Sequence, residues 1–146
     1  MVQAGFPYDG SIGYTLKRAQ SALRSRMDEV LRPLGLTTPQ YSCLEALKHS
    51  PGASNAELAR AVFVSRQSMN TLLRGLQDRG LVARADAPVG GRALPTTLTD
   101  EGRSRLAAAT ALIGDIETEL VDALGPQRRD DLVAALSACI DALDGH

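Results

Sequence analysis

The sequence has few of the residues and runs on which several protein classes depend. Cys43 and Cys139 are the only cysteines among 146 residues, and they lie too far apart to form a disulfide framework or a zinc knuckle. The apolar runs are a few residues long, far short of the roughly 20 that span a bilayer, so we expect no membrane segment. Residues 1–9 do not contain a basic stretch followed by an apolar stretch, so we expect no signal peptide. Together these features predict a protein of the reducing cytoplasm.

The motifs of common enzyme sites are missing as well. The two histidines, His49 and His146, form no HExxH zinc motif, and neither a GxSxG nucleophile elbow nor a GxGxxG phosphate loop occurs. We therefore expect no enzyme activity, no metal ion and no cofactor. Aromatic residues make up only 3% of the chain, which argues against an aromatic cage for a ligand.

Charge is unevenly distributed along the chain, although the net charge is only −1. Residues 54–92 carry six arginines against three acidic residues, whereas residues 93–146 carry four arginines against ten acidic residues. A basic centre followed by an acidic end indicates that an anion binds near the middle of the chain. Charge alone is equally consistent with arginines on an ordinary solvated surface.

Apolar residues at intervals of three and four predict long amphipathic helices at both ends of the chain. One covers residues 11–34, and the other two share residues 99–144 with a break at Gly125-Pro126. Between them, Thr37 with Gln40 and Ser54 with Glu57 have the spacing of capping boxes, so we expect a further helix to begin at each. The leucine-rich end helices predict a homodimer that buries them, and a monomer that folds its own ends together is the alternative.

A helix-turn-helix followed by a hairpin is predicted in the middle of the chain. The second of its helices runs from Ser65 to Arg79, and the hairpin from Leu81 to Leu98, where Pro95 confines the second strand to an edge or to partial pairing. With the apolar stripe set aside, the outward face of that second helix holds only hydrogen-bonding residues without an acid: Arg66, Gln67, Ser68, Asn70, Thr71 and Arg74. Arginine pairs with guanine, and glutamine and asparagine pair with adenine, which favours a helix that reads the major groove.

Several strings, taken in order, resemble the MarR (multiple antibiotic resistance regulator) family. They are Leu36-Thr37…Gln40…Leu44…Leu47, Glu57-Leu58-Ala59, Leu76-Gln77-Asp78-Arg79-Gly80-Leu81-Val82…Arg84, and Arg92…Leu98-Thr99…Gly102. The resemblance covers about residues 12–143. It implies a mainly α fold with a small β-hairpin wing, built as a single domain over residues 1–146. Dimerisation helices are expected at about 11–34 and 99–144, and a winged helix-turn-helix at about 37–98.

The resemblance also implies a function. Such proteins are homodimers that bind near-palindromic double-stranded DNA operators, and most are repressors released by a small, often aromatic, ligand. The residues expected to contact DNA are Ser65, Arg66, Gln67, Ser68, Asn70, Thr71, Arg74, Arg84 and Arg92. The family usually has an aspartate two residues before the wing-tip arginine. This chain has Gly90 there, so we expect Arg92 to be held less rigidly.

The family binds its ligands between the first, second and fifth helices. That position makes Tyr14, Arg18, Tyr41 and Cys43 the expected lining residues of an effector pocket. Two other functions stay open at this point. Oxidation of Cys43 is one, although no obvious neighbour lowers the pKa of this thiol. A winged helix that binds another protein instead of DNA is the second.

Overall fold

The computed structural model describes residues 10–84 and 95–145, and the chain divides into two compact units, Met1–Thr110 and Ala111–His146. The first unit contains every element from α1 (Ile12–Leu31) to the first turns of α5 (Asp100–Leu124). The second unit contains the rest of α5 and α6 (Pro126–Asp144). No helix in the described ranges is both long and apolar enough to cross a membrane.

The helix predicted over residues 11–34 is present as α1 and a closing 3-10 turn, η1 (Arg32–Leu34). Ser11 caps α1, because its side chain accepts a hydrogen bond from Tyr14 N at 3.2 Å. The chain leaves η1 through Gly35, whose φ of 68° lies in the left-handed region that glycine adopts readily. Near the end of α1, Asp28 accepts hydrogen bonds from the side chain and backbone of Thr38, and these bonds hold its pKa below the ordinary value.

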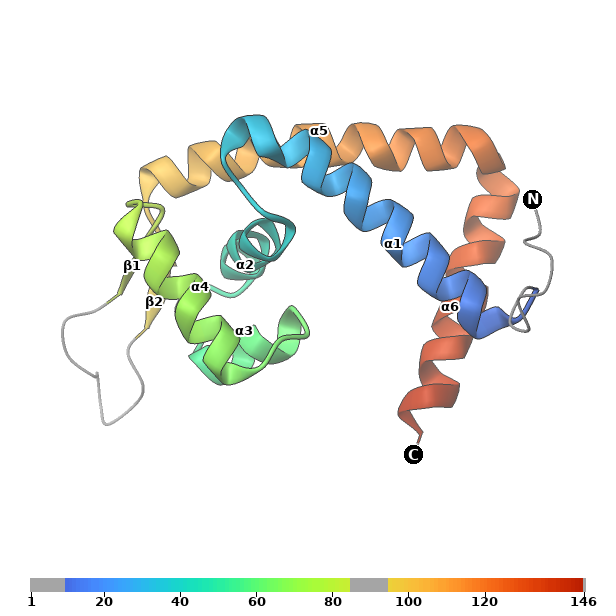
Figure 1. Cartoon of the computed structure of the whole chain (residues 1–146), viewed down its shortest axis with the longest axis horizontal. Coiled ribbons are helices and arrows are strands. Elements are labelled where there is room, and N and C mark those ends of the chain that lie inside the picture. Colours follow the sequence, from blue (N-terminus) through green and yellow to red (C-terminus); the bar gives the residue numbers. More distant parts are fainter. Residues whose placement is uncertain (1–9, 85–94, 146) are drawn as a thin grey trace. The chain divides into compact units, whose positions relative to one another are not determined.

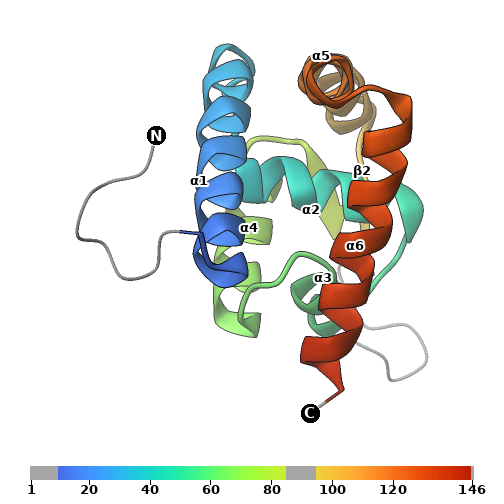
Figure 2. The ribbon, with the colours of Figure 1, turned by 90° about the vertical axis from the view of Figure 1, so that its right-hand side faces the viewer.

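Helix α2 (Thr38–His49) lies at the centre of the first unit, in contact with α1, α3, α4 and β2 (Figures 1 and 2). The predicted capping boxes are both formed, at Thr37 with Gln40 ahead of α2 and at Ser54 with Glu57 ahead of α3 (Asn55–Ala61). The buried residues of α2 are Cys43, Leu44 and Leu47. The central position of α2 follows from this stripe, since it supplies apolar side chains to the core.

Helix α4 (Arg66–Asp78) follows α3 after a short turn. Its buried residues, Met69, Leu73 and Leu76, recur at the predicted spacing and pack into the core. Gly80, with a φ of 74°, ends the helix and leads the chain into the first strand.

The wing is a two-stranded antiparallel sheet that lies beside α4 (Figure 1). Val82 in β1 (Val82–Arg84) pairs with Leu98 in β2 (Thr96–Leu98), and Arg84 pairs with Thr96. The predicted second strand contained Pro95, but β2 begins one residue later. Proline lacks the N–H group that a ladder requires, so regular pairing starts at Thr96.

Helix α5 begins directly after the wing. Thr99 caps it, because its Oγ1 accepts from Gly102 N at 3.0 Å and donates to the Gly80 carbonyl at 2.6 Å. A Cβ at position 102 would lie 2.0 Å from the carbonyl oxygen of Leu81, so only glycine fits this approach between α5 and the wing. In the second unit, α5 and α6 leave large apolar side chains exposed: Leu120, Leu132, Val133, Ile140 and Leu143.

Candidate nucleic-acid interface

The outward face of α4 presents polar side chains together on one helix. Because Met69, Leu73 and Leu76 are buried, the opposite side of the helix faces solvent. All the residues predicted for this face are exposed: Arg66, Gln67, Ser68, Asn70, Thr71 and Arg74. Their guanidinium, amide and hydroxyl groups are those that hydrogen-bond base edges and phosphates.

The N-terminal end of α4 is organised by Ser65. Its Oγ accepts from Ser68 N at 3.0 Å and donates to Ser68 Oγ at 3.0 Å. The first turn of α4 contains no acidic residue. The partial positive charge of the helix N-terminus is therefore not cancelled locally, and it adds to the charge of Arg66.

Asn55, the first residue of α3, links the outward face of α4 to the wing. Its Nδ2 donates to Oδ1 of Asn70. Its Oδ1 accepts from Nη2 of Arg84 at 3.3 Å. Arg84 is half-buried, and its Nε has no hydrogen-bond partner within residues 10–84 and 95–145. One amide thus positions two of the predicted DNA-contacting residues. Asn55 was not among the predicted residues, because spacing alone does not show that these positions meet.

The tip of the predicted wing cannot be compared with the structure. Arg92 and the preceding Gly90 lie in the segment 85–94, outside the described ranges. The contact of Arg92 with DNA therefore stays a prediction.

Two arginines outside the predicted site hold the turn between α1 and α2. Arg79, just after α4, donates from Nη1 to the Gly35 carbonyl at 2.7 Å. Arg105 in α5 donates from Nη1 to the Leu34 carbonyl at 2.8 Å. Hydrogen bonds from charged donors are stronger than neutral ones. The C-terminal end of α4 is thereby tied to the end of the N-terminal helix segment.

Two of the residues predicted to line an effector pocket lie on α1. Tyr14 and Arg18 are one turn apart, and the guanidinium carbon of Arg18 lies 6.0 Å from the centre of the Tyr14 ring. This distance is at the outer limit of a cation–π contact. It pairs the two side chains with each other on the same helix.

The other two predicted lining residues lie on α2 and differ in accessibility. Tyr41 is half-buried, and burial together with the charge of Glu45 raises the pKa of its phenol. Cys43 is fully buried, with its Sγ 3.7 Å from Sδ of Met69 on α4. Burial raises the pKa of the Cys43 thiol to about 11. A thiol that is buried and protonated at neutral pH is poorly suited to sensing oxidants.

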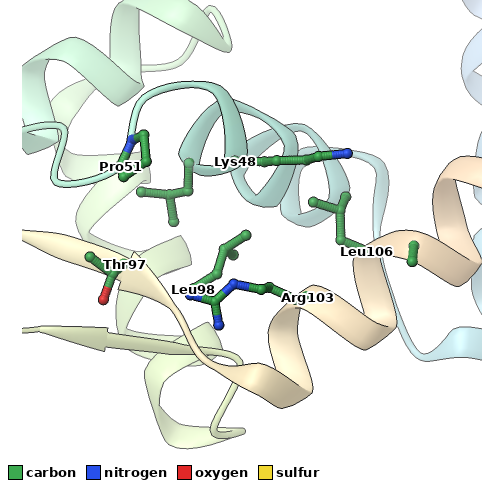
Figure 3. Close-up of a pocket in the computed structure, with 8 residues that line it drawn as sticks. Lys48, Pro51, Thr97, Leu98, Arg103 and Leu106 are labelled. Atoms are coloured by element: carbon green, nitrogen blue, oxygen red, sulfur yellow. The ribbon is translucent and has the colours of Figure 1, made fainter.

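A pocket of about 360 Å³ lies between the end of α2, strand β2 and the first turns of α5 (Figure 3). Its walls are mainly apolar, and Lys48 and Arg103 add two cations. In Figure 3 the side chain of Arg103 extends towards Leu98, while Lys48 extends from α2 above Leu106. Arg103 also pairs with the exposed Asp100 at 3.0 Å. An apolar cavity with a few charged groups is the usual form of a small-molecule site, and the residues predicted from the sequence do not line this one.

The comparisons with known proteins decide the family. A MarR family model matches residues 34–93, which extend from η1 through β1 into the segment after it. The HTH-type transcriptional repressor Rv2887 of Mycobacterium tuberculosis is 43% identical over 127 residues, which are 86% of this chain and 91% of that protein. The chain belongs to the MarR family. The family and this relative are transcription regulators.

Solved structures of MarR-type repressors share the fold of the chain. Rv2887 in complex with DNA gives a TM-score of 0.73 at 37% identity, with 90% of this chain and 98% of that chain covered. The transcriptional repressor CouR bound to a 23-mer DNA duplex gives a TM-score of 0.85 at 32% identity, with coverage of 96% and 99%. Rv2887 has also been solved with salicylic acid, and CouR with p-coumaroyl-CoA. The winged helix-turn-helix predicted from the sequence is confirmed, with α3 and α4 as its helices and β1–β2 as its wing.

Proposed function

We propose that this MarR family protein is a homodimeric transcriptional repressor. It binds near-palindromic double-stranded DNA in the cytoplasm, catalyses no reaction, and leaves its operator when a small carboxylate binds. The observation that carries the proposal is the outward face of α4, which contains no acidic residue. The opposite side of the helix is held in the core by Met69, Leu73 and Leu76. The repressors Rv2887 and CouR, both solved with DNA, support it.

Each polar group of this face has a role that its chemistry allows. Arg66 and Arg74 pair with guanine, and Gln67 pairs with adenine. Asn70 has an Oδ1 that accepts from Asn55, which leaves its Nδ2 to donate to a base or a phosphate. The remaining contacts, from Ser65, Ser68, Thr71, Arg84 and the wing-tip Arg92, go to the backbone phosphates and set the register of the helix in the groove.

The exposed apolar residues of α5 and α6 are the surface on which a second copy would pack. Exposed side chains such as Leu132, Ile140 and Leu143 lie on one helix of nineteen residues, and contiguous apolar surface of this kind marks an interface. Burial of these residues, together with α1, in a two-fold dimer would place two α4 helices about one turn of DNA apart, roughly 34–36 Å. Sedimentation of a monomer at micromolar concentration would contradict the dimer.

The effector site we propose is the pocket between α2, β2 and α5. Its volume of about 360 Å³ falls within the roughly 300–1,000 Å³ of ordinary ligand sites. Lys48 and Arg103 suit a carboxylate, and the apolar walls suit an aromatic ring. The pocket lies against β2, so a bound molecule acts directly on the base of the wing. Tyr14, Arg18, Tyr41 and Cys43 stay predicted ligand residues that the structure does not place in this pocket.

Two measurements test the proposal. Selection of duplexes from a random DNA pool is expected to recover an inverted repeat, and recovery of nothing above background would favour a protein partner instead. Salicylate is then titrated against the complex with the selected duplex. We expect release by wild-type protein and weaker release by Arg103→Gln. Arg129→Gln is the matched control, because Arg129 also pairs with a neighbouring acid, Asp130, at 3.0 Å but lies on α6.

A further inference from the structure

The turn between α3 and α4 exposes a phenylalanine almost completely. Phe63 is 93% exposed, more than any other large apolar side chain in the part of the chain that the structure describes. Its neighbours Val62 and Val64 are both half-buried. The ring therefore contributes almost no apolar burial to the folded chain, although a phenyl group stabilises a fold mainly through burial.

Phe63 also occupies an unfavourable backbone conformation. Its φ of 62° makes it the one residue other than glycine with a positive φ among the residues that the structure describes. Two backbone hydrogen bonds fix the turn, from Val62 N to the Leu58 carbonyl at 3.1 Å and from Val64 N to the Ala59 carbonyl at 3.0 Å. The left-handed conformation is thus required by the turn. Glycine or asparagine adopts it at lower cost than a bulky residue.

The fold therefore gains nothing from a phenylalanine at this position and is strained by it. Strained residues with exposed side chains concentrate at functional sites. Phe63 precedes the cap residue Ser65 by two positions, so it lies at the end of α4 that enters the groove in helix-turn-helix proteins. From Leu58 to Gln77 every charged residue is an arginine: Arg60, Arg66 and Arg74. Because the charges around Phe63 in the sequence are all positive, the favoured partner is DNA rather than a protein.

We propose that Phe63 contacts DNA at the outer edge of each half-site, with its ring against deoxyribose and the C5-methyl group of a thymine. The proposal rests on the function proposed above and adds a residue to it. Phenylalanine makes apolar contacts of this kind with thymine methyl groups. Arg60 and Arg66, on the two sides of the turn, are both exposed, so Arg60 can hold the adjacent phosphate while Arg66 pairs with guanine. Phe63 thereby provides preference for thymine next to the base pairs that α4 reads.

The test compares Phe63→Asn with Phe63→Leu on the duplex recovered by selection with wild-type protein. Asparagine relieves the strained backbone and removes the apolar contact, whereas leucine keeps both the strain and an apolar side chain. We expect Phe63→Asn to lower DNA affinity by about three- to tenfold, as loss of part of a phenyl ring's burial implies. The melting temperature should stay unchanged or rise. Phe63→Leu should keep most of the affinity.

A second duplex, with deoxyuridine in place of thymidine at the edges of each half-site, isolates the methyl contact. Wild-type affinity should fall by roughly fourfold, the value of one buried methyl group, and the affinity of Phe63→Asn should not change. Equal affinity of wild type and Phe63→Asn for the selected duplex would overturn the inference while leaving the proposed function intact. A lower melting temperature for Phe63→Asn would overturn it also, since the ring would then be structural. If wild type bound no duplex specifically, the proposed function itself would fail.

Discussion

Replacement of Asn55 by aspartate is expected to stabilise the fold and to weaken DNA binding at the same time. The new carboxylate keeps the acceptor position that receives Arg84 Nη2 at 3.3 Å, and the contact becomes an ion pair. The exposed Asn70 amide can turn over so that it donates to the carboxylate instead of accepting. A partly exposed ion pair contributes about 0.2–1 kcal/mol, and an acid in the first turn of a helix about 0.3–1 kcal/mol. We therefore expect the free energy of unfolding to rise by about 1 kcal/mol.

The same carboxylate neutralises the positive charge of Arg84, which we expect to contact a DNA phosphate. If the charge of Arg84 offsets one phosphate, its loss reduces the slope of log K against log salt by about 0.9 per protomer. Fluorescence anisotropy with the selected duplex at several salt concentrations measures that slope, and thermal denaturation measures the stability.

Asn55→Ala is the matched control, because it removes both hydrogen bonds of the amide without adding charge. The half-buried Arg84 then loses its acceptor, which should cost about 1–3 kcal/mol of stability. Its charge remains, so the salt slope should stay near the wild-type value. A wild-type slope in Asn55→Asp as well would refute the reasoning, because it would show that the Arg84 charge does not act on DNA.

Three further predictions concern the packing of side chains within the fold. Leu73→Ala should lower the free energy of unfolding by about 2–5 kcal/mol, since Leu73 is 0% exposed; chemical denaturation measures it, and a loss below 1 kcal/mol would contradict the packing. Gly102→Ala should cost about 3 kcal/mol or prevent folding, because its Cβ would meet the Leu81 carbonyl. Gly114→Ala, with open space around it, should be neutral or stabilising, and equal losses in the two variants would be inconsistent with the structure. Iodoacetamide at pH 8 should spare Cys43, which is buried and whose pKa is raised by that burial to about 11; rapid modification of Cys43 in folded protein would show that this thiol is accessible.

Local signals in the sequence were sufficient for most of the secondary structure. The capping boxes at Thr37 and Ser54 both form because each needs only residues three positions apart. The stripe that includes Met69 and Leu73 likewise fixed which side of α4 faces solvent. The predicted second strand included Pro95, whereas β2 begins at Thr96, since composition showed a strand but not where pairing begins.

Contacts between distant parts of the chain could not be predicted in the same way. Arg79 reaches the Gly35 carbonyl across 44 positions, and Arg105 reaches Leu34 across 71. Neither pairing leaves a periodic pattern, because it depends on how the helices pack. The pocket between α2, β2 and α5 was missed for the same reason, since its walls come from three separate elements. The family resemblance led to the prediction that Cys43 lines an effector pocket, and the structure places its Sγ 3.7 Å from Sδ of Met69 in the core.

The claim that α4 reads DNA sequence is tested most directly by one comparison. Affinities of wild type, Arg74→Ala and Arg129→Ala are measured for the selected duplex and for every single base-pair substitution within a half-site. The account predicts that Arg74→Ala loses about 1–3 kcal/mol of binding free energy and loses discrimination at one position of each half-site. Arg129→Ala, on α6, should match wild type throughout. Full discrimination by Arg74→Ala at every position, with unchanged affinity, would contradict the account.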